Sequence, residues 1–545
     1  MNLSVFISGI TDRTKIVLSV LLIHLFVFSS ISFAADKKNN KTTDEERQRE
    51  IEKTLFMVAG AQDRVVKIGL VDCILYALKN NSEILIKRID PKLKEDDVRI
   101  AKADFEPTFK LDYNLRDNAK LSANTLSGAN VSQYRDIDLN AGVSGKLALG
   151  TEYNVEFISE RYKSNSSFQT INPYYATEPK ITLTQPLLRD FGTVVNEADI
   201  RIAKNDKRTS DESFKNTVMD IISKTKIAYY NYRYYLENYA IAKSSLDRAK
   251  DLLEINRARY AKGLVSSVDL LETETSLAQR QKVLISAESN LKKAEDDLKL
   301  ITNIVDDPEA WNAKLELIDS RLEFKEEKTG LLESLENAFK YRPDYSSTKL
   351  DLKNRDIKIA SAKNALLPTV DLVTSFGLNG LGKDYQDALN KTDSDYKDWS
   401  IGFKVEVPWG GEERAKFDQR HLEKAQALLA FKRLEQNIIL EVRDKVRDVD
   451  IQARQVEAAK LARDKEAKNY EAQKERYAAG QVSTHDMLDY QEKLAQAELD
   501  YAKSLIDYNV ALINLDKSQG LTLAKNNIKV LSDGEQAKGE ATLEE

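Results

Sequence analysis

The chain has little of several residue types on which particular folds and chemistries depend. Its 545 residues include one cysteine, so no disulfide can form within the chain. Nine prolines occur, none of them beyond Pro408, which leaves long stretches free to form unbroken helices. The 82 lysines and arginines nearly balance the 88 aspartates and glutamates, and this balance argues against the basic surface of a nucleic-acid-binding protein.

Residues suited to catalysis or metal binding are equally scarce. Three histidines occur, and the two outside the N-terminal leader, His421 and His485, lie on helical patterns without ligand-spaced partners. There is no phosphate-binding loop and no nucleophile elbow. Cys73 sits between Asp72 and Ile74 on an apolar-patterned helix, where we expect it to be buried and inert. The sequence therefore predicts no enzyme, no metal site and no cofactor.

The N-terminus is typical of a secretory signal peptide. Arg13 and Lys15 form its basic region, and Ile16 to Phe28 is nearly all apolar. Ser32-Phe33-Ala34 supplies small residues at the positions that signal peptidase reads, so residues 1–34 are predicted to be removed. A membrane anchor is the alternative, although the apolar run falls short of the ~20 residues that a bilayer span needs. No other segment is long and apolar enough to cross a membrane as a helix.

A fourteen-residue motif occurs twice, from Arg259 to Glu272 and again from Arg476 to Asp489. Eight of the fourteen residues are identical, and the fifth residue of each copy is a glycine, Gly263 or Gly480. Internal repetition is the signature of a repeated architecture. We therefore predict two similar helical hairpins that turn at glycine, the residue that most readily takes the left-handed conformation ending a helix.

Very long helices are predicted on both sides of each motif. Thr193 to Lys262 and Glu412 to Ala479 contain neither glycine nor proline, and each would be roughly 100 Å long as one helix. The return arms, Leu264 to Asp307 and Gln481 to Gln519, also lack both residues. Such lengths predict a coiled-coil-like duct, rod or bundle. A tyrosine cluster between Tyr229 and Tyr239 suits either packing between helices or the lining of a passage.

The repeats divide the chain. After a lead-in over 35–66, we assign 67–325 to the first repeat and 326–525 to the second, and 526–545 to a disordered acidic tail. Each repeat opens with short helices, and in the first we expect a break and cap at Asn80-Asn81-Ser82 and a disturbance at Pro91.

Strands are predicted within each repeat, over about 108–186 and 369–408. Thr108 to Arg116 and Trp399 to Val407 alternate cleanly between apolar and polar residues. Val370 to Phe376 is a weaker case, and Ile137 to Leu147, Tyr153 to Phe157 and Ile181 to Gln185 complete the set. This alternation suits tilted strands of a membrane barrel. A soluble sheet packed on one face would give the same pattern.

Two repeats of helices, strands and a long hairpin, behind a signal peptide, resemble the TolC family of outer-membrane efflux proteins. The resemblance covers about residues 66–525. Its specific parts are the two Arg-Tyr-x-x-Gly tips, Asn80-Asn81, Phe105-Glu106-Pro107-Thr108, and Gln185-Pro186-Leu187-Leu188 with Phe191-Gly192.

The resemblance implies a mainly α fold with β structure. Three identical protomers would each give four strands to a shared transmembrane β-barrel, and long antiparallel helical hairpins to a trimeric α-helical barrel in the periplasm. The implied activity is passive conduction, in drug efflux or type I secretion. The implied partners are outer-membrane lipid, a periplasmic adaptor (membrane fusion) protein and an inner-membrane transporter of RND, ABC or MFS type, with no nucleic acid.

The first strand block departs from this family pattern. Residues 108–185 hold enough alternation for four strands, where the family repeat uses two, whereas 369–407 hold two. The extra block, around Gly145 to Arg161, is either a longer surface hairpin or a pair of additional strands. The strand number of the barrel stays open at this point.

The resemblance also implies a gate at the hairpin tips, with acidic residues that select cations. Asp486 and Asp489 match the family's acidic pair, and Asp269 and Glu272 occupy the equivalent places of the first tip. Ser266-x-x-Asp269 and Ser483-x-x-Asp486 have an alternative interpretation as helix N-terminal caps. We therefore assign capping to Asp269 and Asp486, and favour the gate role for Asp489.

A family latch joins a tip tyrosine and arginine to an aspartate of the neighbouring hairpin. Tyr477 is similar to that tyrosine and Asp269 to its partner, but Val482 stands at the arginine position. The tip residues Gly263, Leu264, Gly480 and Gln481 are the expected adaptor contacts. His485 is either a titrating group or an exposed polar residue.

Two other functions compete with the exit duct. One is a periplasmic coiled-coil scaffold that carries a soluble sheet domain. The other is a secreted enzyme on a helical stalk, which the lack of a catalytic set disfavours.

Overall fold

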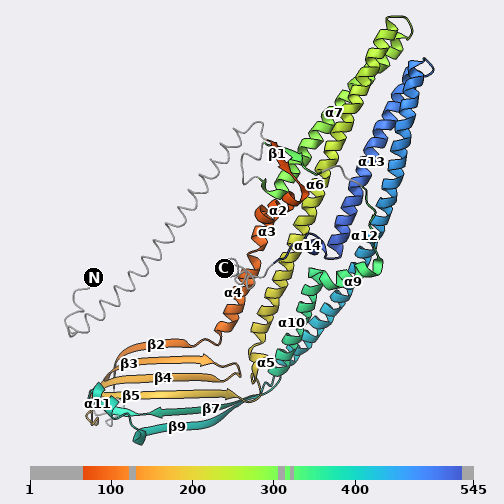
Figure 1. Cartoon of the computed structure of the whole chain (residues 1–545). Coiled ribbons are helices and arrows are strands. Elements are labelled where there is room, and N and C mark those ends of the chain that lie inside the picture. The colour runs from red at the N-terminus through yellow and green to blue at the C-terminus, as the bar shows by residue number, and fades with distance from the viewer. Residues whose placement is uncertain (1–64, 122–129, 305–312, 320–323, 531–545) are drawn as a thin grey trace, which may run out of the picture.

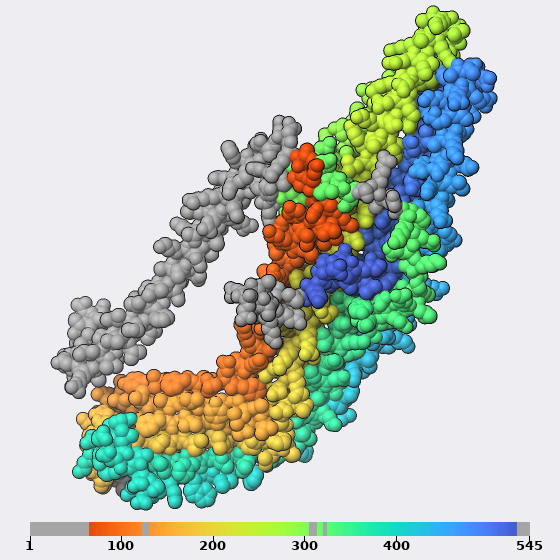
Figure 2. Space-filling view, viewed as in Figure 1, coloured from red at the N-terminus to blue at the C-terminus, as the bar shows by residue number. Residues whose placement is uncertain are grey.

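The computed structural model describes residues 65–121, 130–304, 313–319 and 324–530. A sheet forms one end of the molecule, and helices run from it in one direction to two tips at the far end (Figure 1). In the space-filling view the two tips stand side by side as separate projections (Figure 2). The predicted signal peptide, almost all of the lead-in and the tail after Val530 lie outside the described residues.

The four long helices confirm the prediction from the glycine- and proline-free stretches. They are α6 (Ala198–Tyr260), α7 (Ser267–Thr302), α12 (Glu412–Ala478) and α13 (Thr484–Ser518). The 63 residues of α6 and the 67 of α12 correspond to roughly 95–100 Å. One detail differs from the expected single helix, because Glu197 separates α6 from the short α5 (Thr193–Asn196).

Shorter helices open each repeat. In the first repeat α2 (Leu70–Asn80), α3 (Ser82–Lys87) and α4 (Asp90–Ala103) follow one another, and the Asn81 side chain caps α3, as predicted. Pro91 lies in the first turn of α4, where its missing N–H costs no hydrogen bond. In the second repeat α9 (Leu331–Tyr341) and α10 (Pro343–Ala365) cover a similar span with one break fewer.

The large sheet is an antiparallel meander. Its long strands are β2 (Thr108–Leu121), β3 (Val131–Lys146), β4 (Glu152–Ser164), β5 (Tyr174–Pro186), β7 (Thr369–Leu378) and β9 (Lys397–Glu406), hydrogen-bonded in that order. The short β8 (Gly380–Gly382) pairs with β5. The helix α11 (Tyr385–Asn390) and the 3-10 turn η4 (Ser394–Tyr396) complete the loop between β8 and β9.

The register decides between the two interpretations of the first strand block. β3 and β4 are additional full-length strands, with Val143 opposite Val155 and Tyr134 opposite Ser164. Their connecting turn lies at the helical end of the sheet, where the Gly192 amide donates to the Leu149 carbonyl at 3.0 Å. Each chain therefore contributes six long strands to this sheet rather than the four that the resemblance implied.

One face of this sheet is apolar across its whole width. The register aligns its large apolar residues into a band, and many are exposed, with Phe109 and Phe403 each at 69%. The other exposed members of this band are Leu111, Tyr113, Leu115, Leu139, Val143, Val155, Ile181, Leu183, Phe376, Trp399, Ile401 and Val405. The opposite face carries mainly polar residues of the same strands.

The described helices contain no stretch that is both long and apolar enough to cross a bilayer.

A second, two-stranded sheet was not predicted. β1 (Val65–Ile68) pairs in parallel with β6 (Lys314–Leu317). The two strands lie about 250 residues apart in the sequence, so no local sequence pattern predicts their pairing. The buried Tyr232 of α6 donates from its hydroxyl to the Leu315 carbonyl at 2.7 Å. Packing is thus confirmed as the role of this part of the tyrosine cluster. Cys73 is buried in the same core cluster, as predicted, and its burial raises the pKa of its thiol to about 12.

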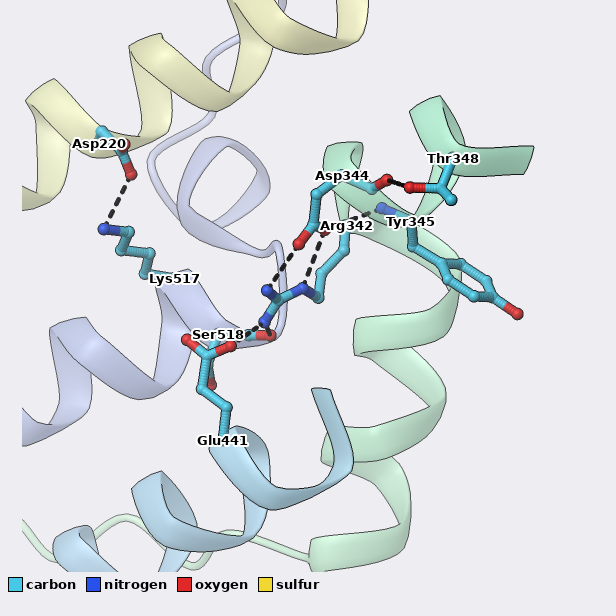
Figure 3. A network of polar contacts seen from close by, with 8 residues as sticks. All are labelled: Asp220, Arg342, Asp344, Tyr345, Thr348, Glu441, Lys517 and Ser518. Atoms are coloured by element: carbon cyan, nitrogen blue, oxygen red, sulfur yellow. Dashed lines mark hydrogen bonds and ion pairs between the residues drawn. The ribbon is translucent and has the colours of Figure 1, made fainter. Parts of the chain in front are cut away.

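Midway along the helices, a polar network joins the start of α10 to two long helices (Figure 3). The Arg342 guanidinium donates to Asp344 at 2.8 Å, to Glu441 of α12 at 2.7 Å and to the Ser518 carbonyl at the end of α13 at 3.0 Å. Burial alone would raise the pKa of Asp344, but the hydrogen bond and charge of Arg342 outweigh burial and hold this pKa below its usual range.

We predict that Asp344→Asn lowers the free energy of unfolding by about 1–3 kcal/mol at neutral pH, because it weakens a charge-assisted hydrogen bond. The folded-state pKa of Asp344 is lowered, so its contribution is complete above about pH 4 and is lost as the pH falls through that folded-state pKa. Thermal unfolding of the detergent-solubilised protein between pH 3 and 7 measures both effects. Asp351→Asn, which only breaks a surface pair with Arg355, is the control. Equal losses in the two variants would contradict the assignment.

Candidate functional site at the helical tips

Both tips turn at glycine, as the repeated motif predicts. Gly263 has φ 69° and Gly480 has φ 76°, the left-handed region that favours glycine. The Leu264 amide donates to the Arg259 carbonyl and the Gln481 amide to the Arg476 carbonyl, each at 3.0 Å. These bonds, with those from the two glycine amides, form Schellman motifs that end α6 and α12.

The serines after these turns cap the return helices. The Asp269 amide donates to Ser266 Oγ at 3.2 Å, and the Ser266 amide donates back to Asp269 Oδ2 at 2.9 Å, which completes a capping box. The Asp486 amide donates to Ser483 Oγ at 3.1 Å. Hydrogen bonds from the Ser266 side chain and then its backbone lower the pKa of Asp269. Both serines therefore cap their helices, with the aspartates in the first turn as the motif predicts, and the reciprocal capping box is complete only for Ser266 and Asp269.

The other two predicted carboxylates lie one turn further along, in a groove between α7 and α13. This groove has a volume of about 490 Å³, and Glu272, His485 and Asp489 line it. The Asp489 side chain is about half exposed and forms an ion pair with Lys493, with 2.7 Å between Oδ2 and Nζ. Arg280 of α7 and Glu492 of α13 bridge the groove at 3.2 Å. The structure therefore brings Glu272 and Asp489 to one groove, whose lining does not include Asp269 and Asp486.

Within this chain Tyr477 and Asp269 have other partners than each other. Tyr477 is only 3% exposed, and its hydroxyl donates to Asn256 and lies 3.2 Å from Thr484 Oγ1. Asp269 is engaged by Ser266 instead. The tyrosine faces inward because its ring packs into an apolar cluster with Leu252, Tyr470, Met487 and Leu494.

An arginine does meet Tyr477, from the other hairpin. The Arg259 guanidinium lies 4.5 Å from the centre of the Tyr477 ring, and it donates to the Tyr477 carbonyl at 2.8 Å and the Ala478 carbonyl at 3.1 Å. Val482, which stands at the family's arginine position, packs against the apolar cluster. Arg259 thus ties the end of α6 to the end of α12.

A buried asparagine that sequence reasoning missed holds the tips together. Asn256 of α6 is fully buried, and its amide donates to Thr273 of α7 at 2.8 Å and to Thr484 of α13 at 3.5 Å, while Tyr477 of α12 donates to its oxygen. All four long helices meet at this side chain. A signal was present, since Asn256 continues the apolar stripe of Leu252 on α6.

Comparisons with known proteins agree on one family. A family model described as outer membrane efflux protein matches residues 155–303 and 335–521, more than half of the chain. The outer membrane protein TolC of Escherichia coli (strain K12) is 20% identical over 400 residues, which cover 71% of this chain and 76% of that protein.

Solved structures show the same fold at low sequence identity. The CmeC outer membrane channel of Campylobacter jejuni aligns with a TM-score of 0.62 and 18% identity, over 86% of this chain and 88% of that one. The outer membrane protein VceC of Vibrio cholerae aligns with a TM-score of 0.60 and 14% identity, over 83% and 96%.

We predict that Asn256→Ala loosens the tips without unfolding the helices. The change removes the buried hydrogen bonds that Asn256 makes with Tyr477 and Thr273, which costs about 1–3 kcal/mol. Amide hydrogen exchange should accelerate in peptides covering 250–275 and 470–490 and stay unchanged at the sheet. Arg257→Ala is the matched control, because Arg257 is exposed and forms a surface ion pair with Glu274. Equal exchange at the tips of both variants would show that Asn256 does not hold them.

Proposed function

Because the chain belongs to the family of outer membrane efflux proteins, we propose that it is the exit duct of a tripartite efflux or type I secretion system. It is a passive channel of the outer membrane, with its helical part in the periplasm, and not an enzyme. In the proposed assembly, substrates pass from an inner-membrane transporter, through a periplasmic adaptor, into the duct and out of the cell.

One observation carries this proposal over the coiled-coil scaffold. A soluble sheet with one apolar face would be covered by other elements, whereas here Phe109, Trp399 and Phe403 are each more than 60% exposed. The band spans all the long strands at the end opposite the tips. A face of this kind suits lipid, and the polar face then suits a water-filled interior.

The sheet edges support a homotrimer. β2 and β9 are the two edge strands of a six-strand antiparallel meander, so they run in opposite directions. An edge in lipid would leave backbone groups unpaired, and pairing β9 of one protomer with β2 of the next removes both edges. Three copies of six strands would close a barrel of 18 strands, a size at which barrels of this kind leave an aqueous channel.

The tips are the proposed contact surface for the adaptor. Leu264 and Gln481 follow the turn glycines at the end of the molecule farthest from the sheet (Figure 1). Leu264 is 69% exposed, which leaves an apolar side chain available to a partner. The inner-membrane transporter, of RND, ABC or MFS type, would supply the energy.

We predict that photo-crosslinking residues placed at Leu264 and Gln481 capture a periplasmic protein of the adaptor class in living cells. The same residue placed at Asn118 or Asp393, at the opposite end of the sheet strands, should capture none. Immunoblotting and mass spectrometry of the crosslinked bands identify the partner. Capture from Asn118 or Asp393, with none from the tips, would reverse the proposed orientation.

The groove between the return helices supports a cation-selective gate. Asp489 does not take part in a helix cap. Its ion pair with Lys493 is exposed to solvent and contributes little to stability, so the carboxylate is available to cations. Three copies of Asp489 around a narrow entrance would raise the local concentration of cations. Glu272, which lines the same groove, would add to this field.

We predict that Asp489→Asn lowers the cation preference of the channel and weakens block by multivalent cations, because it removes one charge per protomer from the entrance. Lys493→Gln should act in the opposite direction, since it removes the partner of the same carboxylate. Asp486→Asn should leave selectivity nearly unchanged and lower helix stability by about 0.5–1 kcal/mol. Single-channel reversal potentials in planar bilayers measure the first two effects. If Asp486→Asn alone shifts the potential, the roles of the two carboxylates are reversed.

A further inference from the structure

The additional hairpin β3–β4 gathers three carboxylates on the polar face of the sheet. Asp136 and Asp138 lie two residues apart on β3, and Glu160 stands directly opposite Asp138 on β4. One carboxylate oxygen from each residue lies within 4.8 Å of the others. We propose that these side chains form a binding site for a divalent cation, and that the cation is Ca²⁺.

Two oxygens without hydrogen-bond partners point to a ligand rather than to a solvated acidic patch. Asp136 is only 7% exposed, and its buried Oδ1 atom has no hydrogen-bond partner. Asn140, the next residue along the same face of β3, also has a buried Oδ1 without a partner. A buried oxygen without a donor costs free energy, and a cation is the partner that a row of oxygens suits.

The charges fit a divalent ion. Arg116 of β2 approaches the cluster, with nitrogens 3.7 Å from Asp136 Oδ2 and 3.4 Å from Asp138 Oδ2. One guanidinium against three carboxylates leaves two negative charges to be balanced. The Arg116 side chain is 62% exposed, so it can turn away when a cation binds. Arg116 is therefore a competitor for the site and not a ligand.

The surroundings hold the ligands in place. Tyr174 of β5 donates to one oxygen of Glu160 at 3.1 Å, which fixes that carboxylate. The rings of Tyr134, Tyr162 and Tyr174 stack in a row beside the cluster, with centres 5.6 and 5.2 Å apart. Ca²⁺ accepts several carboxylate and amide oxygens in irregular geometry, whereas Mg²⁺ requires near-octahedral geometry and usually keeps more water. An oxygen set held on two strands favours Ca²⁺.

Two of the three carboxylates lie outside the part of the chain that matches the family. Asp136 and Asp138 precede residue 155, where that match begins, whereas Glu160 lies within it. The inference rests on the proposed function only where it places this face toward the pore. There, ions from the cell exterior would reach the site, and bound Ca²⁺ would make the pore lining less negative.

The test is calcium binding to the purified trimer in detergent, by isothermal titration and by thermal unfolding in Ca²⁺, Mg²⁺ or chelator. We expect one Ca²⁺ per chain, with a dissociation constant of about 0.1–1 mM, as in extracellular calcium modules. Asp138→Asn and Glu160→Gln should each weaken binding roughly tenfold or more, because affinity follows the number of charged ligands. Glu156→Gln, on the same face of β4 but outside the cluster, is the matched control.

Arg116→Gln tests whether the carboxylates bind a cation or are only neutralised by Arg116. If Arg116 competes with calcium, its removal tightens calcium binding several-fold. If Arg116 only neutralises the carboxylates, the variant is less stable than the wild type and calcium does not restore its stability, which would overturn the proposal. The proposal would also be overturned if the wild type bound no calcium, or if Asp138→Asn and Glu160→Gln bound calcium as tightly as the wild type.

Channel recordings test separately whether the calcium site faces the pore. With the polar face toward the pore, external Ca²⁺ should lower cation preference in the wild type and have less effect in Glu160→Gln. Calcium binding that is lost in Glu160→Gln, without any calcium effect on current, would support the site and contradict the placement of this face in the pore.

Discussion

The backbone of the two edge strands is the constraint on which the rest of this molecule depends. β2 and β9 each present an unpaired row of N–H and C=O groups beside an apolar face that suits lipid. Lipid provides no hydrogen bonds, so these groups need partners from other protein strands. Copies of the same chain supply them without any new sequence, because the two edges run in opposite directions. The helices α4, α6, α10 and α12 all join the sheet at one end, so the long helical hairpins extend from that end (Figure 1).

The helices extend far beyond the sheet, and polar contacts between elements hold them together at separate levels. Most ion pairs on their surfaces join residues three or four positions apart on one helix, and such pairs contribute little. Polar contacts between different elements are fewer, and some of them also lie at the surface. Three involve side chains that are buried or mostly buried: Tyr232 with β6, Arg342 with α12 and α13, and Asn256 at the tips. Each contact ties a different pair or set of elements. The tips could therefore loosen at Asn256 while the network at Arg342 stays intact.

Local patterns predicted the parts of this structure that depend on local physics. The long helices, the glycine turns and the capping serines follow from neighbouring residues, and the strand alternation follows from burial on one face. The pairing of β1 with β6 joins residues about 250 positions apart, and the inward turn of Tyr477 depends on Asn256 of the other hairpin. No local window contains both partners. Asp136, Asp138 and Glu160 were missed because carboxylates on facing strands converge only once the register is known.

The additional strands also satisfy two geometric conditions. An inserted pair leaves the direction of β5 unchanged, so α6 still begins at the helical end of the sheet, whereas one or three extra strands would have sent it to the other side. The widths match as well. Six strands about 4.8 Å apart and tilted by about 40° span roughly 38 Å of circumference. At the junction α4, α6, α10 and α12 pack side by side in that order, and four helices about 9 Å apart span roughly 36 Å. The sheet and the helices of one protomer can therefore cover equal parts of the circumference of a common tube. Four strands would span only roughly 25 Å, so six strands match the width of this helical layer better.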